Sequence, residues 1–409
     1  MNSETGLTDS YVHIIPSNGY GDPNILRQLL KNEKPDAIFL ITDPRYWEWL
    51  FRIENEVRKQ CPILYLNIWD DLPLPLYNKD FYDSCDALFG ISKQTVNINR
   101  LVLGEKAKNK VIRYIPHGIN ENKFFPIEHK EVIKKGKQQH FNGKEPEFVA
   151  LFNSRNIRRK CIPDLLVAWQ LFQNTLTPEQ QNNSALLLHT DPLDPNGTDL
   201  LAVREALFGF DSNVYFTQGK YDHSGMNLLY NIADVTILPS SAEGWGLSLT
   251  ESMMAGTMII GNVTGGIQDQ MRFEDEEGKW INFDDDFLSN HFGKYKNHGN
   301  WALPVFPNNM SIVGSLQTPY IYDDRLDFRD LSKAISKIYE LEPEQRNQFG
   351  LNGREWVTSD ESGMSASNMC KNIIDGVNET LNTWKPTKSF SLTKSVKPKE
   401  KKITHSLVY

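Results

Sequence analysis

The 409-residue sequence contains few cysteines and no long hydrophobic run, and each absence excludes a class of protein. Its four cysteines, Cys61, Cys85, Cys161 and Cys370, are scattered without close pairs, which argues against a zinc site and against a disulfide framework. No apolar stretch is long enough to span a membrane, and the first residues show neither the basic start nor the apolar stretch of a signal peptide. We therefore expect a cytoplasmic protein with no membrane span.

Motifs of several enzyme classes are missing as well. The sequence has no Gly-x-Ser-x-Gly nucleophile elbow, no histidine cluster with metal-ligand spacing and no phosphate loop that ends in Gly-Lys-Ser or Gly-Lys-Thr. Hydrolase and nucleotide-triphosphatase activities are therefore unsupported. The net charge of −8 also disfavours general binding to nucleic acids.

This charge is unevenly distributed along the chain. Residues 385–409 contain seven lysines and one glutamate, a formal charge of +6. Together with their prolines, serines and threonines, this composition predicts a flexible tail. Two interpretations remain open for it: the tail contacts an anionic partner such as DNA or phospholipid, or it only increases solubility.

What the sequence does contain is enough apolar residues for a large enzyme and a regular alternation of strands and helices. Hydrophobic residues make up 39% of the chain and aromatic residues 11%, which suffices to fill the cores of two or three domains. The alternation predicts parallel sheets covered by helices on both faces. We expect strands at 11–16, 36–42, 62–68, 87–91 and 111–116, and a second series at 147–154, 185–189, 213–217, 234–238 and 257–261.

The two series predict an α/β protein with two Rossmann-like, doubly wound domains that face a cleft. In such sheets, ligands bind at the carboxyl ends of the strands. The expected divisions are a first domain at 1–126, a linker of weak periodicity at 127–146, a second domain at 147–363 and a helix at 364–384.

Two carboxylates, Glu243 and Glu251, lie eight positions apart around a predicted turn between a buried strand and a helix. The apolar spacing typical of a helix continues from 247 to 255, and Gly256 ends it. Two separate carboxylates suit a ligand with hydroxyl groups in two places, such as a sugar and a ribose. An arbitrary pair of glutamates would more often lie on the surface, but the glycines around Trp245 and the preceding strand argue for a binding site.

The same turn is suited to an anion. Gly244 and Gly246 let the backbone approach a ligand closely. The amides of Leu247 and Ser248 belong to the start of the helix, where the positive end of the helix dipole meets a phosphate. The turn is therefore predicted to hold a phosphorylated sugar.

A basic segment follows the strand at 147–154. Arg155 and Lys160 lie between this strand and a helix that Pro163 and Asp164 open, as residues suited to a first helical turn. Two fixed cations and a helix N-terminus can neutralise a bound anion without a metal ion. The alternative is that the segment is merely a basic loop.

These segments resemble the donor site of retaining glycosyltransferases of family 4, which have the GT-B fold. The resemblance is carried by Glu243-Gly-Trp-Gly-Leu-Ser-Leu-Thr-Glu251, by the following Met254-Ala-Gly-Thr and Gly265-Gly266, and by the spacing of Arg155 and Lys160. It implies that Glu243 contacts the transferred sugar and that Glu251 binds the ribose. It further implies diphosphate contacts for Arg155 and Lys160. The remaining donor-binding residues are expected to be Gly244, Trp245, Gly246, Leu247, Ser248 and Gln218.

Two further segments resemble the family pattern, and one residue departs from it. Residues 111–126 are similar to the segment that closes the first domain, and the helix at 364–384 would cross back onto that domain. Within the first segment, His117 is either a general base on the acceptor side or a structural residue at a strand end. Cys161 occupies a position where the family usually has glycine.

The part of the chain expected to bind the acceptor departs more strongly from the family pattern. Family members open with a strand and a Gly-rich loop, whereas this chain is expected to begin one or two strands later. Members also often carry a histidine near the transferred sugar, where this chain has Trp69 or Asp70. Asp70 either orients the sugar or an acceptor hydroxyl, or it is an ordinary loop acid like Asp71.

Residues 267–327 form a long insertion of irregular pattern that the family pattern lacks. Its aromatic content favours an ordered segment that packs near the cleft. Parts of it resemble transferases of tailed bacteriophages, which implies modified bases of viral DNA, besides glycans, as acceptors and the host cytoplasm as compartment. Asp284-Asp-Asp286 contains the Asp-x-Asp pattern of metal-dependent transferases of another fold, but consecutive acids in a polar loop usually face solvent.

We therefore expect a retaining, metal-independent transferase that moves a sugar from a nucleotide diphosphate, a UDP- or GDP-sugar, to an acceptor hydroxyl. No cofactor and no metal site are expected. The alternatives are a catalytically inactive nucleotide-sugar-binding protein, and a sugar phosphorylase or nucleotide-sugar epimerase on the same fold.

Overall fold

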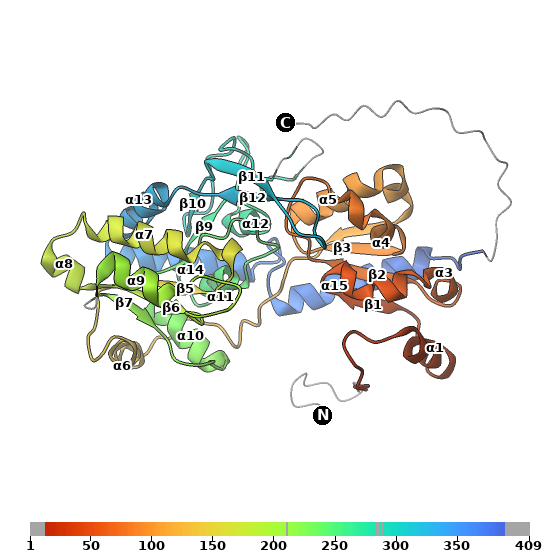
Figure 1. The fold of residues 1–409 in the computed structure, drawn as a ribbon, viewed down its shortest axis with the longest axis horizontal. Coiled ribbons are helices and arrows are strands. Elements are labelled where there is room, and N and C mark those ends of the chain that lie inside the picture. The colour runs from red at the N-terminus through yellow and green to blue at the C-terminus, as the bar shows by residue number, and fades with distance from the viewer. Residues whose placement is uncertain (1–12, 210–211, 284–286, 288, 389–409) are drawn as a thin grey trace.

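A computed structural model describes residues 13–209, 212–283, 287 and 289–388, which form two parallel sheets with helices packed against them (Figure 1). Three predictions fall wholly or partly outside these residues. They concern the acids at 284–286, the tail beyond residue 388 and the first two residues of the strand expected at 11–16.

The first sheet has four strands in the order β1-β2-β3-β4, and every neighbouring pair is parallel. Its central strands are buried on both faces, which explains their nearly continuous apolar sequence. The strands are β1 (Ile38–Ile41), β2 (Ile63–Asn67), β3 (Ala87–Gly90) and β4 (Val111–Tyr114). The helices of this part are α1 (Pro23–Asn32), α2 (Glu48–Phe51), α3 (Glu54–Val57), α4 (Lys79–Asp83) and α5 (Lys93–Leu103), with 3-10 turns at Pro44–Trp47, Leu76–Asn78 and Gly104–Asn109.

The expected strand at 11–16 is wrong for its described residues, 13–16, which form no strand. A strand needs a neighbour that accepts and donates its backbone hydrogen bonds. The apolar side chains of Ile14 and Ile15 in this segment are 81% and 40% exposed. None of the described strands pairs with residues 13–16 to satisfy those hydrogen bonds.

The second sheet has six strands in the order β10-β9-β8-β5-β6-β7, again all parallel. The five strands expected for this part are confirmed, and β10 is an addition. The strands are β5 (Phe148–Asn153), β6 (Ser184–His189), β7 (Val214–Phe216), β8 (Val235–Leu238), β9 (Met258–Asn262) and β10 (Ala302–Val305). The helices are α6 (Lys130–His140), α7 (Ile162–Gln173), α8 (Pro178–Asn182), α9 (Leu200–Phe208), α10 (His223–Ile232), α11 (Leu247–Met254), α12 (Ile267–Met271), α13 (Phe328–Tyr339), α14 (Pro343–Thr358) and α15 (Ala366–Thr383), with a 3-10 turn at Arg158–Lys160.

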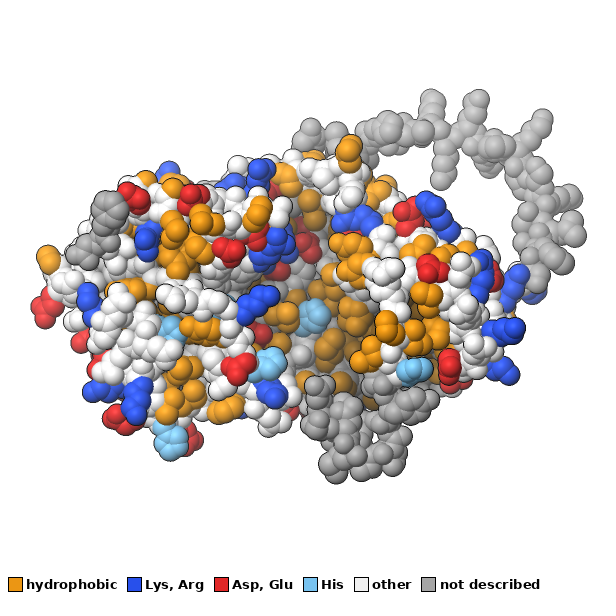
Figure 2. Space-filling model, turned by 60° about the horizontal axis from the view of Figure 1, so that its bottom comes forward, with side chains coloured by type: hydrophobic (Ala, Val, Ile, Leu, Met, Phe, Trp, Pro, Cys, Tyr) orange, Lys and Arg blue, Asp and Glu red, His pale blue; other side chains and the backbone are white. Residues whose placement is uncertain are grey.

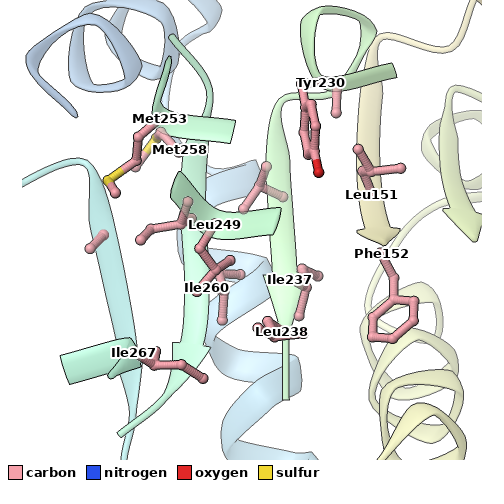
Figure 3. Packing of buried hydrophobic residues seen from close by; sticks show 14 of the residues in the cluster. Leu151, Phe152, Tyr230, Ile237, Leu238, Leu249, Met253, Met258, Ile260 and Ile267 are labelled. Atoms are coloured by element: carbon pink, nitrogen blue, oxygen red, sulfur yellow. The ribbon is translucent and has the colours of Figure 1, made fainter. Parts of the chain in front are cut away.

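Helix α11 is fixed on the second sheet by its apolar face. Figure 3 shows Leu249 and Met253 of this helix beside Ile237 and Ile260 of two neighbouring strands, and all four side chains are fully buried. Because Leu249 and Met253 are four positions apart, they lie on one face of the helix. This packing determines where the first turn of α11 lies.

The insertion at 267–327 is not irregular, contrary to the expectation. It contains α12, the edge strand β10 and an antiparallel hairpin of β11 (Asn309–Val313) and β12 (Ile321–Arg325). The sequence did not predict β10 because this strand contains Pro304, and proline is tolerated in a sheet only at positions such as an edge strand. The hairpin extends from the second sheet towards the first (Figure 1).

The segment at 127–146, expected as a linker of weak periodicity, contains the helix α6. This helix packs on α10, where a side chain at Gly136 would lie 3.0 Å from both Leu228 and Ile232. Because a glycine makes this close contact, the sequence of α6 lacks the regular spacing of apolar residues that would have predicted a helix. Farther along the chain, α15 packs against β3 and β4, with Gly376 against the ring of Phe89.

A buried polar network joins the hairpin to the first sheet. Asp71, which follows β2, and Asp324 of β12 are both 0% exposed. The hydroxyl of Thr264 lies 3.2 Å from Asp71 Oδ2 and 2.8 Å from Asp324 Oδ2, and the hydroxyl of Ser289 also contacts both carboxyl groups. Burial and the mutual proximity of the two acids raise the pKa of Asp71 well above its usual range, so the folded structure favours the protonated form of this carboxyl group.

No helix formed by the described residues has the length and apolar character needed to cross a bilayer.

Candidate active site

A pocket of about 410 Å³ lies between the two sheets, beside the carboxyl ends of their strands. Figure 2 shows the surface hollowed between the two halves of the molecule, with hydrophobic side chains gathered around the hollow. The pocket brings together most of the residues predicted from the sequence. These are Lys160, Glu243, Gly244, Trp245, Gly246, Leu247, Ser248 and Glu251 of the second half, and Asp70 and His117 of the first.

The centre of the pocket wall is a cluster of one acid and two bases. Glu243 accepts hydrogen bonds from Lys160 Nζ and, at 3.1 Å, from Arg159 Nη1. Arg159 Nη1 also donates to the carbonyl of Ala242 at 2.5 Å and lies 3.9 Å from Asp70 Oδ2. The cluster therefore joins the turn after β5, the turn before α11 and the loop after β2.

Burial and pairing set the charges of this cluster. Burial alone would raise the pKa of Glu243, but the nearby Lys160 and Arg159 outweigh it and lower that pKa. Burial lowers the pKa of Lys160, and Glu243 partly restores it. Glu243 is thus ionised at neutral pH and can accept hydrogen bonds from ligand hydroxyl groups, while the two cations remain close to a bound anion.

The second acid of the motif, Glu251, lies at another part of the same wall. Its Oε2 accepts a hydrogen bond of 2.5 Å from the hydroxyl of Tyr230, which in turn accepts one of 2.7 Å from Asn153 Nδ2. Burial raises the pKa of Glu251, and the Tyr230 hydrogen bond opposes this change. The carboxyl group is held in one position and keeps an oxygen available to a ligand.

The turn before α11 provides backbone donors. Gly246 has φ 91° and ψ 61°, a left-handed conformation that glycine adopts without strain. The amides of Leu247 and Ser248 follow in the first turn of the helix, where no preceding helical carbonyl can accept a hydrogen bond from them. Close packing also requires Gly265, since a Cβ atom there would lie 2.0 Å from the carbonyl oxygen of Glu243.

The first half of the chain contributes His117 and Asp70 to the pocket. Burial lowers the pKa of His117, so its imidazole is neutral at pH 7, and the ring lies edge-on to Trp245 at 6.2 Å between centroids. Burial raises the pKa of Asp70, against the effect of Arg159. A side chain at Gly244 would lie 2.7 Å from the carbonyl of Ile68, so the two halves touch here.

Three predicted residues do not line this pocket. The exposed guanidinium of Arg155 is bound to Asp194, with Nε–Oδ2 at 2.6 Å and Nη2–Oδ1 at 3.1 Å. Trp69 is buried behind the wall, where its Nε1 donates to the carbonyl of Asp71. Gln218 is exposed beyond the edge strand β7 and is not brought to the site.

Sequence reasoning missed Arg159, the second cation that lines the pocket. Its neighbour Lys160 was predicted from the family spacing, and that spacing gives no role to the position before it. The 3-10 turn Arg158–Lys160 directs Lys160 and Arg159 to the pocket and leaves Arg158 exposed. The only signal in the sequence was the run of three bases itself.

Cys161 follows this turn with φ 52° and ψ 36°, a left-handed conformation in a residue other than glycine. This explains why glycine suits the position, because the conformation costs about 1–2 kcal/mol for a residue with a side chain. Among the residues that the structure describes, no group of three His, Cys, Asp or Glu side chains is placed to hold a metal ion.

Comparison with known proteins agrees with this geometry. Residues 134–286, which include Lys160, Glu243 and Glu251, match the family model described as Glycosyl transferases group 1. Mannosylfructose-phosphate synthase of Agrobacterium fabrum (strain C58 / ATCC 33970) is 27% identical over 189 residues, 46% of this chain and 39% of that protein. The chain thus spans about two fifths of the length of this curated relative.

Solved structures show the same architecture at low sequence identity. A glycosyltransferase from Rickettsia africae ESF-5 has a TM-score of 0.63 and 16% identity, over 90% of this chain and 85% of that chain. Anabaena Alr3699/HepE in complex with UDP-glucose has a TM-score of 0.60 and 14% identity, over 87% of this chain and 82% of that chain. The predicted GT-B fold, with two Rossmann-like domains, is confirmed.

Proposed function

We propose that this chain, which has a GT-B fold and matches the model of group 1 glycosyl transferases over residues 134–286, transfers a sugar from a nucleotide diphosphate to an acceptor hydroxyl. One observation carries the proposal. Lys160, Arg159, Glu243 and Glu251 converge with the first turn of α11 on a single pocket between the two sheets. This pocket combines acceptors for the hydroxyl groups of a sugar and a ribose with donors for a diphosphate.

The donor fits this wall in one orientation. The diphosphate lies against the amides of Leu247 and Ser248 and against Lys160, because these groups provide the positive charge and the N–H donors. Glu251 accepts from the ribose, and Glu243 accepts from the transferred sugar. Arg155 reaches the diphosphate only by exchanging Asp194 for a phosphate oxygen.

We further propose that the reaction retains the configuration of the anomeric carbon. The bond from this carbon to the diphosphate breaks while a bond to the acceptor oxygen forms on the same face, and the acceptor proton passes to the leaving phosphate oxygen. The products are a glycoside and a nucleoside diphosphate. The protein chiefly stabilises the charge that develops on the leaving group, which is where fixed donors contribute most.

The donor is proposed to be a UDP- or GDP-sugar, and a complex of the Anabaena structure with UDP-glucose supports a donor of this class. Thermal unfolding with UDP, UMP, GDP and GMP tests this proposal. A ligand at a hundred times its Kd stabilises a protein by about 2.7 kcal/mol, so binding is visible as a rise in Tm. We expect the diphosphates to raise Tm more than the monophosphates; equal shifts would contradict the diphosphate site.

The configuration of the product is tested by NMR. With an α-linked donor such as UDP-glucose or GDP-mannose, the first glycoside formed should also be α-linked. A β-linked first product would contradict retention without contradicting transfer.

A variant of Arg159 tests the cation that the sequence did not predict. Arg159→Ala removes one donor to Glu243 and one cation beside the diphosphate, and we expect kcat/KM to fall about tenfold, a loss of about 1.4 kcal/mol in transition-state stabilisation. Arg158→Ala is a matched control, since Arg158 belongs to the same turn but is exposed. The kcat/KM of Arg158→Ala should stay within about twofold of the wild-type value. Equal effects of both variants would argue against a role for Arg159.

A further inference from the structure

A second, smaller pocket of about 130 Å³ adjoins the large one. The two share Ile68 and Asp70, so the carboxyl group of Asp70 lies at their junction. The rest of the wall comes from the turn after β1, from the loop after β2 and from the insertion: Asp43, Pro44, Arg45, Trp69, Thr318 and Ile321. Trp69, predicted for the acceptor side, thus lines this pocket and not the large one. The small pocket therefore begins where a donor sugar in the large pocket would end.

The insertion is bound firmly to the first half of the chain beside this pocket. Tyr322 N donates to the carbonyl of Leu72 at 2.6 Å, and Tyr77 donates its hydroxyl to the carbonyl of Tyr320 at 2.7 Å. The hydroxyl of Tyr320 donates to the carbonyl of Leu74 at 3.1 Å. Thr318 and Ile321 are consequently a fixed part of the pocket.

The charges of the small pocket do not favour an anion. Asp43 accepts from Arg45 Nε at 2.7 Å and from Arg45 Nη2, and Arg45 Nη1 donates to Thr318 Oγ1 at 2.6 Å. Among the described residues that line this pocket, Arg45 is the only cation, and this two-point pair neutralises it. Asp70 adds a second carboxyl group to the wall, and Arg159 Nη1 lies 3.9 Å from its Oδ2. A phosphate group would have to displace Asp43 and also face Asp70.

We infer that the small pocket binds the acceptor and that the acceptor is a neutral hydroxyl compound, a sugar or glycoside without a phosphate group. The inference rests on the proposed function, which it deepens. A hydroxyl group of the acceptor donates to Asp70 and is thereby directed into the large pocket, towards the anomeric carbon of the donor. Its oxygen forms the new bond to that carbon, its proton passes to the leaving phosphate oxygen, and the nucleoside diphosphate is released.

The test uses the full chain with UDP-glucose and GDP-mannose as donors. Donor hydrolysis is measured first, and then transfer to methyl α-glucoside, maltose, fructose, glucose 6-phosphate and fructose 6-phosphate. We expect a neutral acceptor to have a kcat/KM at least tenfold above that of any phosphorylated one. The proposal is overturned if a phosphorylated sugar is preferred, or if hydrolysis proceeds while no neutral sugar is glycosylated. Absence of both donor binding and hydrolysis would instead contradict the proposed function, and the inference with it.

Two variants place the acceptor in the small pocket. Thr318→Trp fills the pocket, and we expect the acceptor KM to rise at least tenfold while UDP still raises Tm as in wild type. Gln317→Trp is the matched control, because this neighbouring residue is exposed and does not line the pocket. It should change the acceptor KM less than twofold. An unchanged acceptor KM in Thr318→Trp would overturn the assignment.

A third variant tests the charge argument. Asp43→Asn keeps the side-chain oxygen that accepts from the amide of Arg45 but removes the charge that neutralises its guanidinium. We expect the preference for neutral over phosphorylated acceptors to fall at least tenfold. If this ratio does not change, Arg45 is not what excludes phosphate, and the argument from charge is overturned.

Discussion

Replacement of Lys160 by alanine is expected to lower kcat/KM for glycosyl transfer by about a hundredfold or more. Lys160 is 7% exposed and provides a buried positive charge beside the site assigned to the diphosphate. Removal of one charge-stabilising contact at a transition state costs about 10²–10³ in kcat. Glu243→Ala should have a similar effect, because it removes the carboxylate proposed to accept a hydrogen bond from the transferred sugar. It also leaves Lys160 without its partner.

Steady-state kinetics with a saturating acceptor measures this effect. Lys137→Ala is a suitable control, because burial also lowers the pKa of Lys137 but its Nζ is bound to the carbonyl of Pro146, outside the pocket. We expect the kcat/KM of this control variant to remain within about twofold of the wild-type value. Turnover of Lys160→Ala at the wild-type rate would remove this residue from the mechanism.

The second large effect concerns stability and pH. Because the folded-state pKa of Asp71 is raised, the folded protein keeps a proton that the unfolded chain loses above pH of about 3.9. The stabilising contribution is fully present below that pH and is lost as pH rises towards the folded-state pKa. The loss amounts to about 1.4 kcal/mol for each pH unit.

Asp71→Asn tests this dependence. The amide group imitates the protonated acid: its oxygen can still accept from the amide of Leu72 and from Gln94, and its NH₂ group can donate to Asp324. The free energy of unfolding of this variant, measured in urea at pH 5, 6 and 7, should increase with pH relative to that of wild type, by up to about 1.4 kcal/mol per pH unit. Parallel pH curves for the two proteins would show that this carboxyl group is not protonated.

Other buried acids influence how steeply the free energy of unfolding depends on pH, but not the difference between Asp71→Asn and wild type. Burial also raises the pKa of Asp70, Glu251 and Asp269, so the stability of the wild-type protein should fall with pH for several reasons. Asp80→Asn, which changes an exposed aspartate in the same half of the chain, controls for a general effect of charge. Its pH curve should run parallel to that of wild type.

Much of the wall of the large pocket was predictable because its residues are close in sequence. Glu243, Glu251 and the glycines between them belong to one strand-turn-helix unit, and the carboxyl ends of parallel strands meet at one edge of a sheet. Local spacing therefore implied proximity in space. The same reasoning placed Lys160, which follows the neighbouring strand β5.

The remaining features depend on contacts that spacing does not encode. Arg155 and Arg159 belong to the same basic segment, but Arg155 pairs with Asp194 outside the pocket, whereas the 3-10 turn Arg158–Lys160 directs Arg159 into it. Asp71 and Asp324 are far apart in sequence and meet only because the hairpin folds back onto the first sheet. The strand expected at 11–16 failed for a related reason, since pairing depends on a neighbour elsewhere in the chain.

The β11–β12 hairpin also restricts how the molecule can move. It is bonded to the first half through Leu72 and to the second half through Ser241, whose carbonyl accepts from Asp324 N at 2.8 Å. A wide hinge-like separation of the halves would break at least one of these attachments. We therefore expect substrates and products to exchange by loosening of small loops around the mouth of the cavity, with the two lobes remaining joined throughout turnover.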